Sequence, residues 1–218
     1  MNKRNLRISR YRRAANKMAV IGVFMSAAFG FLYYGGVIGD AGRTALNVNP
    51  VYAESVKSDA AARNAFLQVA DVFVHPRCKN CHPAGEAPLQ GDEGLVHSMN
   101  VKRGPDGRGK GAARCGNCHQ ATNTPGVNMP PGAPDWRMPT PEMPMVFENK
   151  TPGELCRQLK DPAKNGGRTP EEIVRHVTVE PLVLWGWNPG EGRTMPRSHD
   201  EFVQKMREWA ENGAACPE

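Results

Sequence analysis

The strings Cys78-Lys79-Asn80-Cys81-His82 and Cys115-Gly116-Asn117-Cys118-His119 both read C-x-x-C-H. Two thiols at this spacing on a tight helical turn can reach both vinyl groups of one haem, and the histidine that follows can point its imidazole at the iron. Because the string occurs twice, the sequence predicts two covalently bound c-type haems. We expect thioether bonds at all four cysteines, with His82 and His119 as the proximal iron ligands.

The N-terminal part of the chain predicts export. Residues 18–39 contain no charged residue, and seven Lys or Arg side chains precede them. At 1.5 Å per residue such a helix crosses a hydrocarbon core of ~30 Å, and its basic flank should stay in the cytoplasm. We therefore expect residues 1–53 to be a basic tail, a transmembrane or signal segment and a linker, and 54–218 to be a domain on the periplasmic side. Either residues 18–39 anchor it in the inner membrane, or cleavage near Ala53 releases it.

A zinc site and a pair of redox-active dithiols are the alternative interpretations of the four cysteines. The 33 residues between the two pairs exceed the usual loop of a zinc ribbon. A Cys₄ site also does not require a histidine after each pair. Exported chains mature where haem c is attached, so the sequence favours haem.

The charge of the exported part excludes one class of partner. The whole chain has a net charge of +6, but residues 54–218 hold 20 basic and 21 acidic residues. A nucleic-acid-binding domain needs a basic face, and we expect none here. Between Lys102 and Arg114 five basic residues flank one acid. They are interpreted as a solvated loop, a docking patch for an acidic partner, or a counter-charge for haem propionates.

The fold class predicted is mostly α, a cytochrome c-like di-haem domain with long irregular loops rich in Gly and Pro. A helix is expected from Ser58 through Val74, and Thr151 and Thr169 each begin a capping-box sequence with Pro at the first helical position. Ser198 should cap the last helix. No alternating β-branched runs predict a sheet. The domain has few core-forming residues, so we expect another group to fill its centre.

Each iron has a sixth coordination position. His97 and His176 are the candidate distal ligands, because His75 is too close to its own haem and His199, in the first turn of a helix, is expected at the surface. Met195, followed by Pro, is the main competitor, since this dipeptide before an amphipathic helix is similar to the axial-methionine loop of small cytochromes c.

The remaining cysteines, Cys156 and Cys216, are an even pair in an oxidising compartment. The sequence predicts a disulfide between them, with two buried free thiols as the alternative.

The C-x-x-C-H pairs resemble di-haem c-type cytochromes, and further strings resemble a bacterial group known as isoquinoline 1-oxidoreductase subunits. The resemblance spans about residues 70–216 and is carried by His75-Pro76-Arg77-Cys78, Pro88-Leu89-Gln90-Gly91-Asp92, the Arg103–Gly109 string RGPDGRG, the Leu155–Pro162 string LCRQLKDP and Leu184-Trp185-Gly186-Trp187. It implies a haem-bearing partner of a periplasmic oxidoreductase.

Electron transfer between redox protein partners is therefore the predicted function, with the haems connecting a periplasmic oxidoreductase to the respiratory chain. No nucleophile–base pair or phosphate-binding loop stands out, so no catalytic residues are predicted and an electron carrier is favoured over an enzyme. The alternative is a di-haem peroxidase or a gas or redox sensor, which requires one iron with an open position.

Overall fold

The computed structural model of the chain describes residues 57–218. The predicted apolar segment at residues 18–39 and the predicted cleavage site near Ala53 lie outside the described residues. Within the described part, no helix combines the length and the apolar character that crossing a membrane requires.

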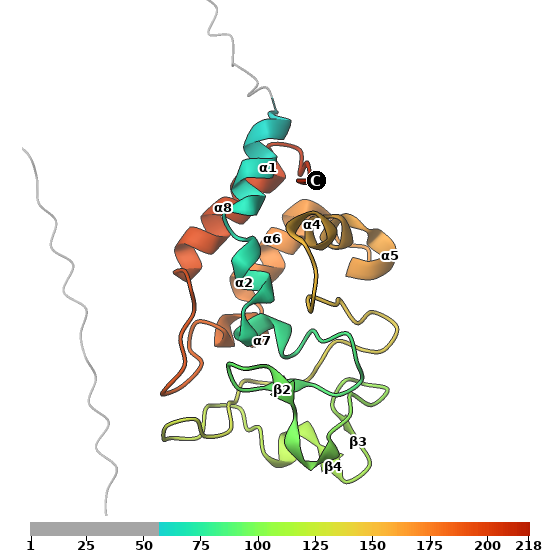
Figure 1. Cartoon of the computed structure of the whole chain (residues 1–218), viewed down its shortest axis with the longest axis vertical. Coiled ribbons are helices and arrows are strands. Elements are labelled where there is room, and N and C mark those ends of the chain that lie inside the picture. Colours follow the sequence, from blue (N-terminus) through green and yellow to red (C-terminus); the bar gives the residue numbers. More distant parts are fainter. Residues whose placement is uncertain (1–56) are drawn as a thin grey trace, which may run out of the picture. The chain divides into compact units, whose positions relative to one another are not determined.

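Helices occupy one end of the described part, and loops with two short ribbons occupy the other (Figure 1). The α-helices are α1 (Asp59–Leu67), α2 (Ala70–Val74), α3 (Pro76–Lys79), α4 (Pro152–Lys160), α5 (Pro162–Asn165), α6 (Pro170–Val179), α7 (Pro181–Trp185) and α8 (His199–Glu211). Single 3₁₀ turns lie at Ser98–Asn100 and Cys115–Asn117. The antiparallel ribbons, which the sequence did not predict, pair β1 (Leu89–Gln90) with β2 (Leu95–Val96) and β3 (Gly109–Lys110) with β4 (Ala113–Arg114).

A single helix was predicted from Ser58 through Val74, and this prediction was wrong, because the segment forms two helices, α1 and α2. Ser58 caps α1 as expected, accepting a hydrogen bond from the backbone of Ala61. The chain then breaks at Val69, which has a non-helical φ of −122°. A continuous helix would separate Phe66 and Phe73 by about 10 Å along its axis. The break instead stacks their rings with centroids 5.8 Å apart.

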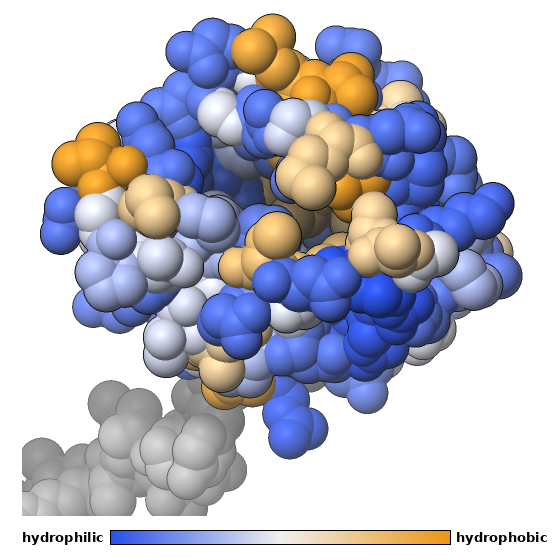
Figure 2. All heavy atoms as spheres, turned by 90° about the horizontal axis from the view of Figure 1, so that it is seen from below, coloured by the Kyte–Doolittle hydropathy of each residue, from blue (hydrophilic) through white to orange (hydrophobic). Residues whose placement is uncertain are grey.

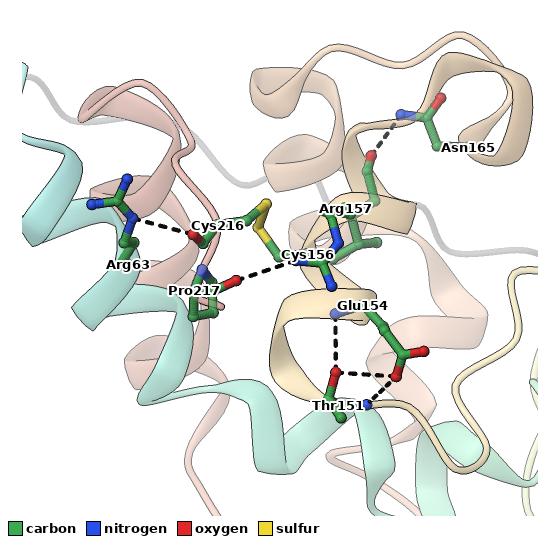
Figure 3. The surroundings of a disulfide bond; sticks show 9 residues. Arg63, Thr151, Glu154, Cys156, Arg157, Asn165, Cys216 and Pro217 are labelled. Atoms are coloured by element: carbon green, nitrogen blue, oxygen red, sulfur yellow. Dashed lines mark hydrogen bonds between the residues drawn. A yellow bond between two sulfur atoms is a disulfide. The ribbon is translucent and has the colours of Figure 1, made fainter.

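The capping-box predictions are confirmed. The backbone N–H of Glu154 donates to Thr151 Oγ1 at 3.3 Å, and the Glu154 carboxylate accepts from the backbone N–H of Thr151 at 2.8 Å (Figure 3). Thr169 and Glu172 repeat this arrangement at the start of α6, and Ser198 caps α8. Each box satisfies backbone N–H groups that the first helical turn leaves without partners.

The core lies between α1, α2, α4, α6 and α8, and aromatic side chains dominate it. Phe66 packs on Trp209 with ring centroids 5.5 Å apart, and Phe73 packs on Phe202 at 5.5 Å and on Phe147 at 5.4 Å. Burying a side chain of this size contributes roughly 1.5–3 kcal/mol. The helical half therefore has a core of its own.

The loop half, residues 80–146, has no comparable apolar core. Between residues 80 and 146, Ala133 and Met138 are the buried aliphatic side chains, beside the buried ring of Pro83. A segment of this length cannot be held together by so little buried apolar surface. Its conformation depends on backbone hydrogen bonds, ion pairs and contacts with the helices.

A disulfide joins Cys156 in α4 to Cys216 near the C-terminus (Figure 3). Two arginines hold the same terminal segment: Arg63 Nε donates to the carbonyl of Cys216 at 3.2 Å, and Arg157 Nη1 donates to the carbonyl of Pro217 at 3.4 Å. The C-terminus is thereby fastened to both α1 and α4.

Removing this bond should destabilise the protein measurably. The disulfide closes a loop across a sequence separation of 60 residues, for which the chain-entropy model gives about 4 kcal/mol. We expect a variant with Cys156→Ala and Cys216→Ala to lose about 2–4 kcal/mol in urea unfolding. Wild-type protein treated with reductant is the control and should match the variant. An unchanged free energy of unfolding would contradict this account.

Candidate functional site

The first C-x-x-C-H motif, residues 78–82, starts inside α3 and ends in the turn that follows. The ring Nδ1 of His75 caps α3 by accepting from the backbone N–H of Arg77 at 3.3 Å. The backbone N–H of Cys81 then donates to the carbonyl of Cys78, and that of His82 to the carbonyl of Lys79. One helical turn therefore carries both thiols and the histidine, and Cys78 packs against the core.

The imidazole of His82 is fixed in position and in tautomer. Its Nδ1 lies 2.7 Å from the carbonyl oxygen of Met145, and its ring stacks on Phe147 with centroids 4.0 Å apart and planes 15° apart. A carbonyl can only accept a hydrogen bond, so the proton is on Nδ1 and the lone pair is on Nε2. Metal-binding histidines commonly have this arrangement, in which the second nitrogen is oriented by a carbonyl.

The second motif, residues 115–119, reproduces this arrangement with different supporting residues. Nδ1 of His119 lies 2.7 Å from the carbonyl oxygen of Pro131, and its ring stacks on Trp136 with centroids 4.7 Å apart and planes 5° apart. Here too the lone pair is on Nε2. Trp136 in turn meets the edge of Trp185 at the end of α7.

His97 lies beside the second motif. Its ring centroid is 6.1 Å from that of His119, and its Nδ1 is 2.9 Å from the carbonyl oxygen of Ser98, which again leaves the lone pair on Nε2. Metal–nitrogen bonds are about 2 Å long, so a metal lies roughly 3 Å from the centre of a coordinated imidazole. The two ring centres are separated by about twice that distance, so a single metal could lie between them.

His176 and Met195 both lie near the first motif. His176 is half-buried in α6, and its charge contributes to lowering the pKa of His82. The Met195 side chain packs against the core, and a Cβ built on Gly186 would lie 3.9 Å from both Met195 Cε and Arg77 Cβ. The distal position at the first site therefore has two candidates, while the second site has His97.

The two histidines that the sequence argument set aside have other partners. His75 Nδ1 is the hydrogen-bond acceptor at the cap of α3, so its proton is on Nε2. His199 was expected at the surface, but it is half-buried. Its Nε2 donates to the carbonyl of Val177 at 2.9 Å, and its ring packs on Trp187.

The side chains of the first motif are placed deeper than those of the second. Burial raises the pKa of the Cys78 thiol to about 12 and that of Cys81 to about 11, and it lowers the pKa of His82 to about 4. All three side chains nevertheless keep some accessible surface. The face that carries the loops is visibly hollowed, with apolar side chains around the opening (Figure 2).

The two motifs adjoin. Burial is the main cause of the raised pKa of Cys81, and the charge of the nearby Cys115 raises it further. Cys115 is itself less deeply placed, and Cys118 is exposed. The first motif is therefore the drier of the two neighbouring sites.

Two separate cavities differ in their relation to the motifs. One of about 360 Å³ is lined by His119, Gly116 and Trp136, and belongs to the second site. The other, about 760 Å³, lies between α6 and α8 and is lined in part by Thr178 and Val203. Its lining contains no residue of either motif, so we do not assign it to the site.

Two observations on residues 57–218 bear on the alternative interpretations of the cysteines. A zinc site needs about four ligands in one place, and no three His, Cys, Asp or Glu side chains within residues 57–218 are grouped to hold a metal ion. One haem iron takes at most two protein ligands, so haem binding needs no such group. Reactive dithiols have a lowered thiol pKa, whereas the pKa values of Cys78, Cys81 and Cys115 are raised.

The basic segment from Lys102 to Arg114 is only partly free. Arg108 pairs with Asp135 at 2.7 Å, and Arg114 pairs with Asp106 at 2.6 Å. Arg103 is 2% exposed and cannot contribute to a surface patch. A docking role for this segment stays a prediction.

Sequence reasoning missed the residues that orient the two motif histidines. The carbonyls of Met145 and Pro131 leave no signal, because every residue has one. Phe147, Trp136 and Trp185 are visible as aromatic residues, but nothing in their spacing connects them to the motifs. Asn123 was also missed: its side chain accepts from Trp185 Nε1 at 2.9 Å and from the backbone of Gly132 at 3.0 Å, and donates to Asn188.

Comparison with known proteins does not identify the chain. No protein-family model matches it, and no curated protein or solved structure does.

Close backbone packing behind the second motif can be tested at two glycines. Gly107 and Gly111 both have positive φ, +73° and +60°, but a Cβ at Gly107 would lie 2.1 Å from the carbonyl oxygen of Met138, whereas a Cβ at Gly111 meets nothing within 4 Å. Gly111→Ala should cost about 1–2 kcal/mol for the left-handed conformation alone. We expect Gly107→Ala to cost several kcal/mol in urea unfolding. Equal losses in the two variants would contradict the packing argument.

Proposed function

We propose that the protein is an electron-transfer protein that carries two covalently attached c-type haems. The observation that carries the proposal is the repeated arrangement at the two motifs. Each combines two free thiols on one turn with a histidine whose Nδ1 donates to a loop carbonyl at 2.7 Å and whose ring stacks on an aromatic side chain. The lone pair on Nε2 of each histidine is thereby available to an iron.

The donor set fits haem c. Cys78 with Cys81, and Cys115 with Cys118, would form the thioethers, and His82 and His119 would be the proximal ligands. The loop half has little apolar core of its own, and the face that carries the loops is hollowed (Figure 2), which leaves space for a large apolar cofactor. Bound haem iron supplies one-electron chemistry by alternating between its ferric and ferrous states.

The residues around the sites suit electron transfer. Each motif histidine is oriented by a hydrogen bond to a carbonyl, of Met145 or Pro131, and its ring is stacked on an aromatic side chain, Phe147 or Trp136. Little rearrangement of the protein would therefore accompany a change of charge at the iron. Cys115 lies near enough to Cys81 for its charge to add to the effect of burial in raising the pKa of that thiol, so the two haems would be neighbours between which an electron could pass. The more open second site would then face a redox protein partner.

We also propose that His97 completes the second site and His176 the first, with Met195 as the competitor at the first. Two imidazoles on one iron lower its reduction potential relative to a histidine–methionine pair. Such potentials suit an acceptor of low-potential electrons. A periplasmic oxidoreductase as donor, and location on the periplasmic side through residues 18–39 or after release near Ala53, belong to the same proposal.

Haem content is the first test. Intact mass after acid–acetone extraction should exceed that of the polypeptide by about 1.2 kDa, the mass of two haems. Replacing Cys78 and Cys81 by Ser should remove half of this increment. The variant without the Cys156–Cys216 disulfide is the control and should keep all of it. A mass equal to that of bare or zinc-bound polypeptide would overturn the proposal.

The distal ligands are tested by spectroscopy of the holoprotein. His97→Ala and His176→Ala should each keep both haems, add a high-spin feature and bind carbon monoxide at one iron, because each opens one coordination position. His199→Ala, in which the replaced histidine bonds to a helix carbonyl, should leave the spectrum unchanged.

Two outcomes would contradict these assignments in different ways. If Met195→Ala opens an iron and His176→Ala does not, Met195 is the ligand at the first site. If the unmutated protein already binds carbon monoxide, the peroxidase or sensor alternative replaces simple electron transfer.

A further inference from the structure

Arg103 is a buried cation whose partner is missing from the described residues. Its side chain is 2% exposed, and the backbone on both sides is tied into the loop. Its own N–H donates to the carbonyl of Glu86 at 2.7 Å, and its carbonyl accepts from Gly109 at 2.9 Å. The position of the side chain therefore follows from the fold and not from a free rotation at the surface.

The guanidinium has five N–H donors, and only one of them has a hydrogen-bond partner in the described residues: Nη2 donates to the carbonyl of Gly85 at 3.0 Å. Nε is buried with no partner. No carboxylate within residues 57–218 lies at ion-pair distance from Arg103, whereas the other buried arginine near the first motif, Arg77, pairs with Asp92.

An isolated buried charge is strongly unfavourable. A buried ion without a counter-ion destabilises the protein. An anion beside the guanidinium would therefore stabilise the arrangement. The anion must present acceptor oxygens to a planar guanidinium, as a carboxylate does.

Such an anion would lie beside the first motif. Arg103 donates from Nη2 to the carbonyl of Gly85, three residues beyond His82, and its backbone N–H donates to the carbonyl of the next residue, Glu86. In the proposed function a haem binds at this motif, and a haem carries two propionate carboxylates.

We propose that Arg103 binds a propionate of the haem at the first motif and that its positive charge raises the reduction potential of that haem. This inference rests on the proposed function. A cation held in a dry site stabilises the ferrous form, which carries one positive charge less than the ferric form. Without the guanidinium, the propionate would be an unpaired anion beside the iron, and the potential would fall.

The test is a spectroelectrochemical titration of the purified holoprotein, with resonance Raman spectra of the propionate bending bands. Arg103→Gln should lower the midpoint potential of one of the two one-electron components, leave the other unchanged and shift a propionate band. The matched control is Lys102→Gln, which removes the same charge from the neighbouring, half-exposed position. It should leave both potentials and the propionate bands nearly unchanged, because water screens that charge.

Arg103→Lys keeps the charge and removes the planar fork. It should largely preserve the potential and still shift the propionate band, and it decides the matter if Arg103→Gln does not fold. Unmoved potentials and bands at full haem content would overturn the inference and leave the proposed function intact. Equal shifts in Arg103→Gln and Lys102→Gln would overturn it as well. Unmutated protein without covalent haem would overturn both.

Discussion

The hydrogen bond from Nδ1 of each motif histidine to a loop carbonyl is the constraint on which the rest of the structure depends. Met145 and Pro131, which accept these bonds, both belong to the Pro-rich stretch between the second motif and α4. That stretch has hardly any buried apolar side chains and forms no helix. Holding two carbonyls against two imidazoles gives it a fixed path, and the path determines where Phe147 and Trp136 lie.

The helical half supplies the stability that the loop half lacks. Its aromatic core runs from Trp209 through Phe66 and Phe73 to Phe147, and Phe147 stacks directly on His82. The first motif is thus an extension of the core. The second motif has no such connection and rests on Trp136, Trp185 and the amide of Asn123. This difference in support agrees with the difference in burial of the two motifs.

Charge is also distributed unequally around the two sites. Near the second motif Arg108 and Arg114 are exposed and matched by Asp135 and Asp106, so water and salt screen what remains of their field. Near the first motif Arg103 is buried, and its field acts through a medium of low dielectric constant. If the two sites held identical haems, as we propose, their reduction potentials would differ, and that difference would give electron flow a direction.

The sequence by itself determined the local features: the two C-x-x-C-H turns, both capping boxes, the helix caps at Ser58 and Ser198, and the pairing of Cys156 with Cys216 as an expectation. These depend on residues a few positions apart or, for the disulfide, on elimination. Tertiary structure alone decided the break at Val69, the two ribbons, the carbonyls that orient the histidines and the burial of Arg103. A backbone carbonyl has no residue-specific signal, and whether an arginine is buried depends on segments distant in the chain that pack around it.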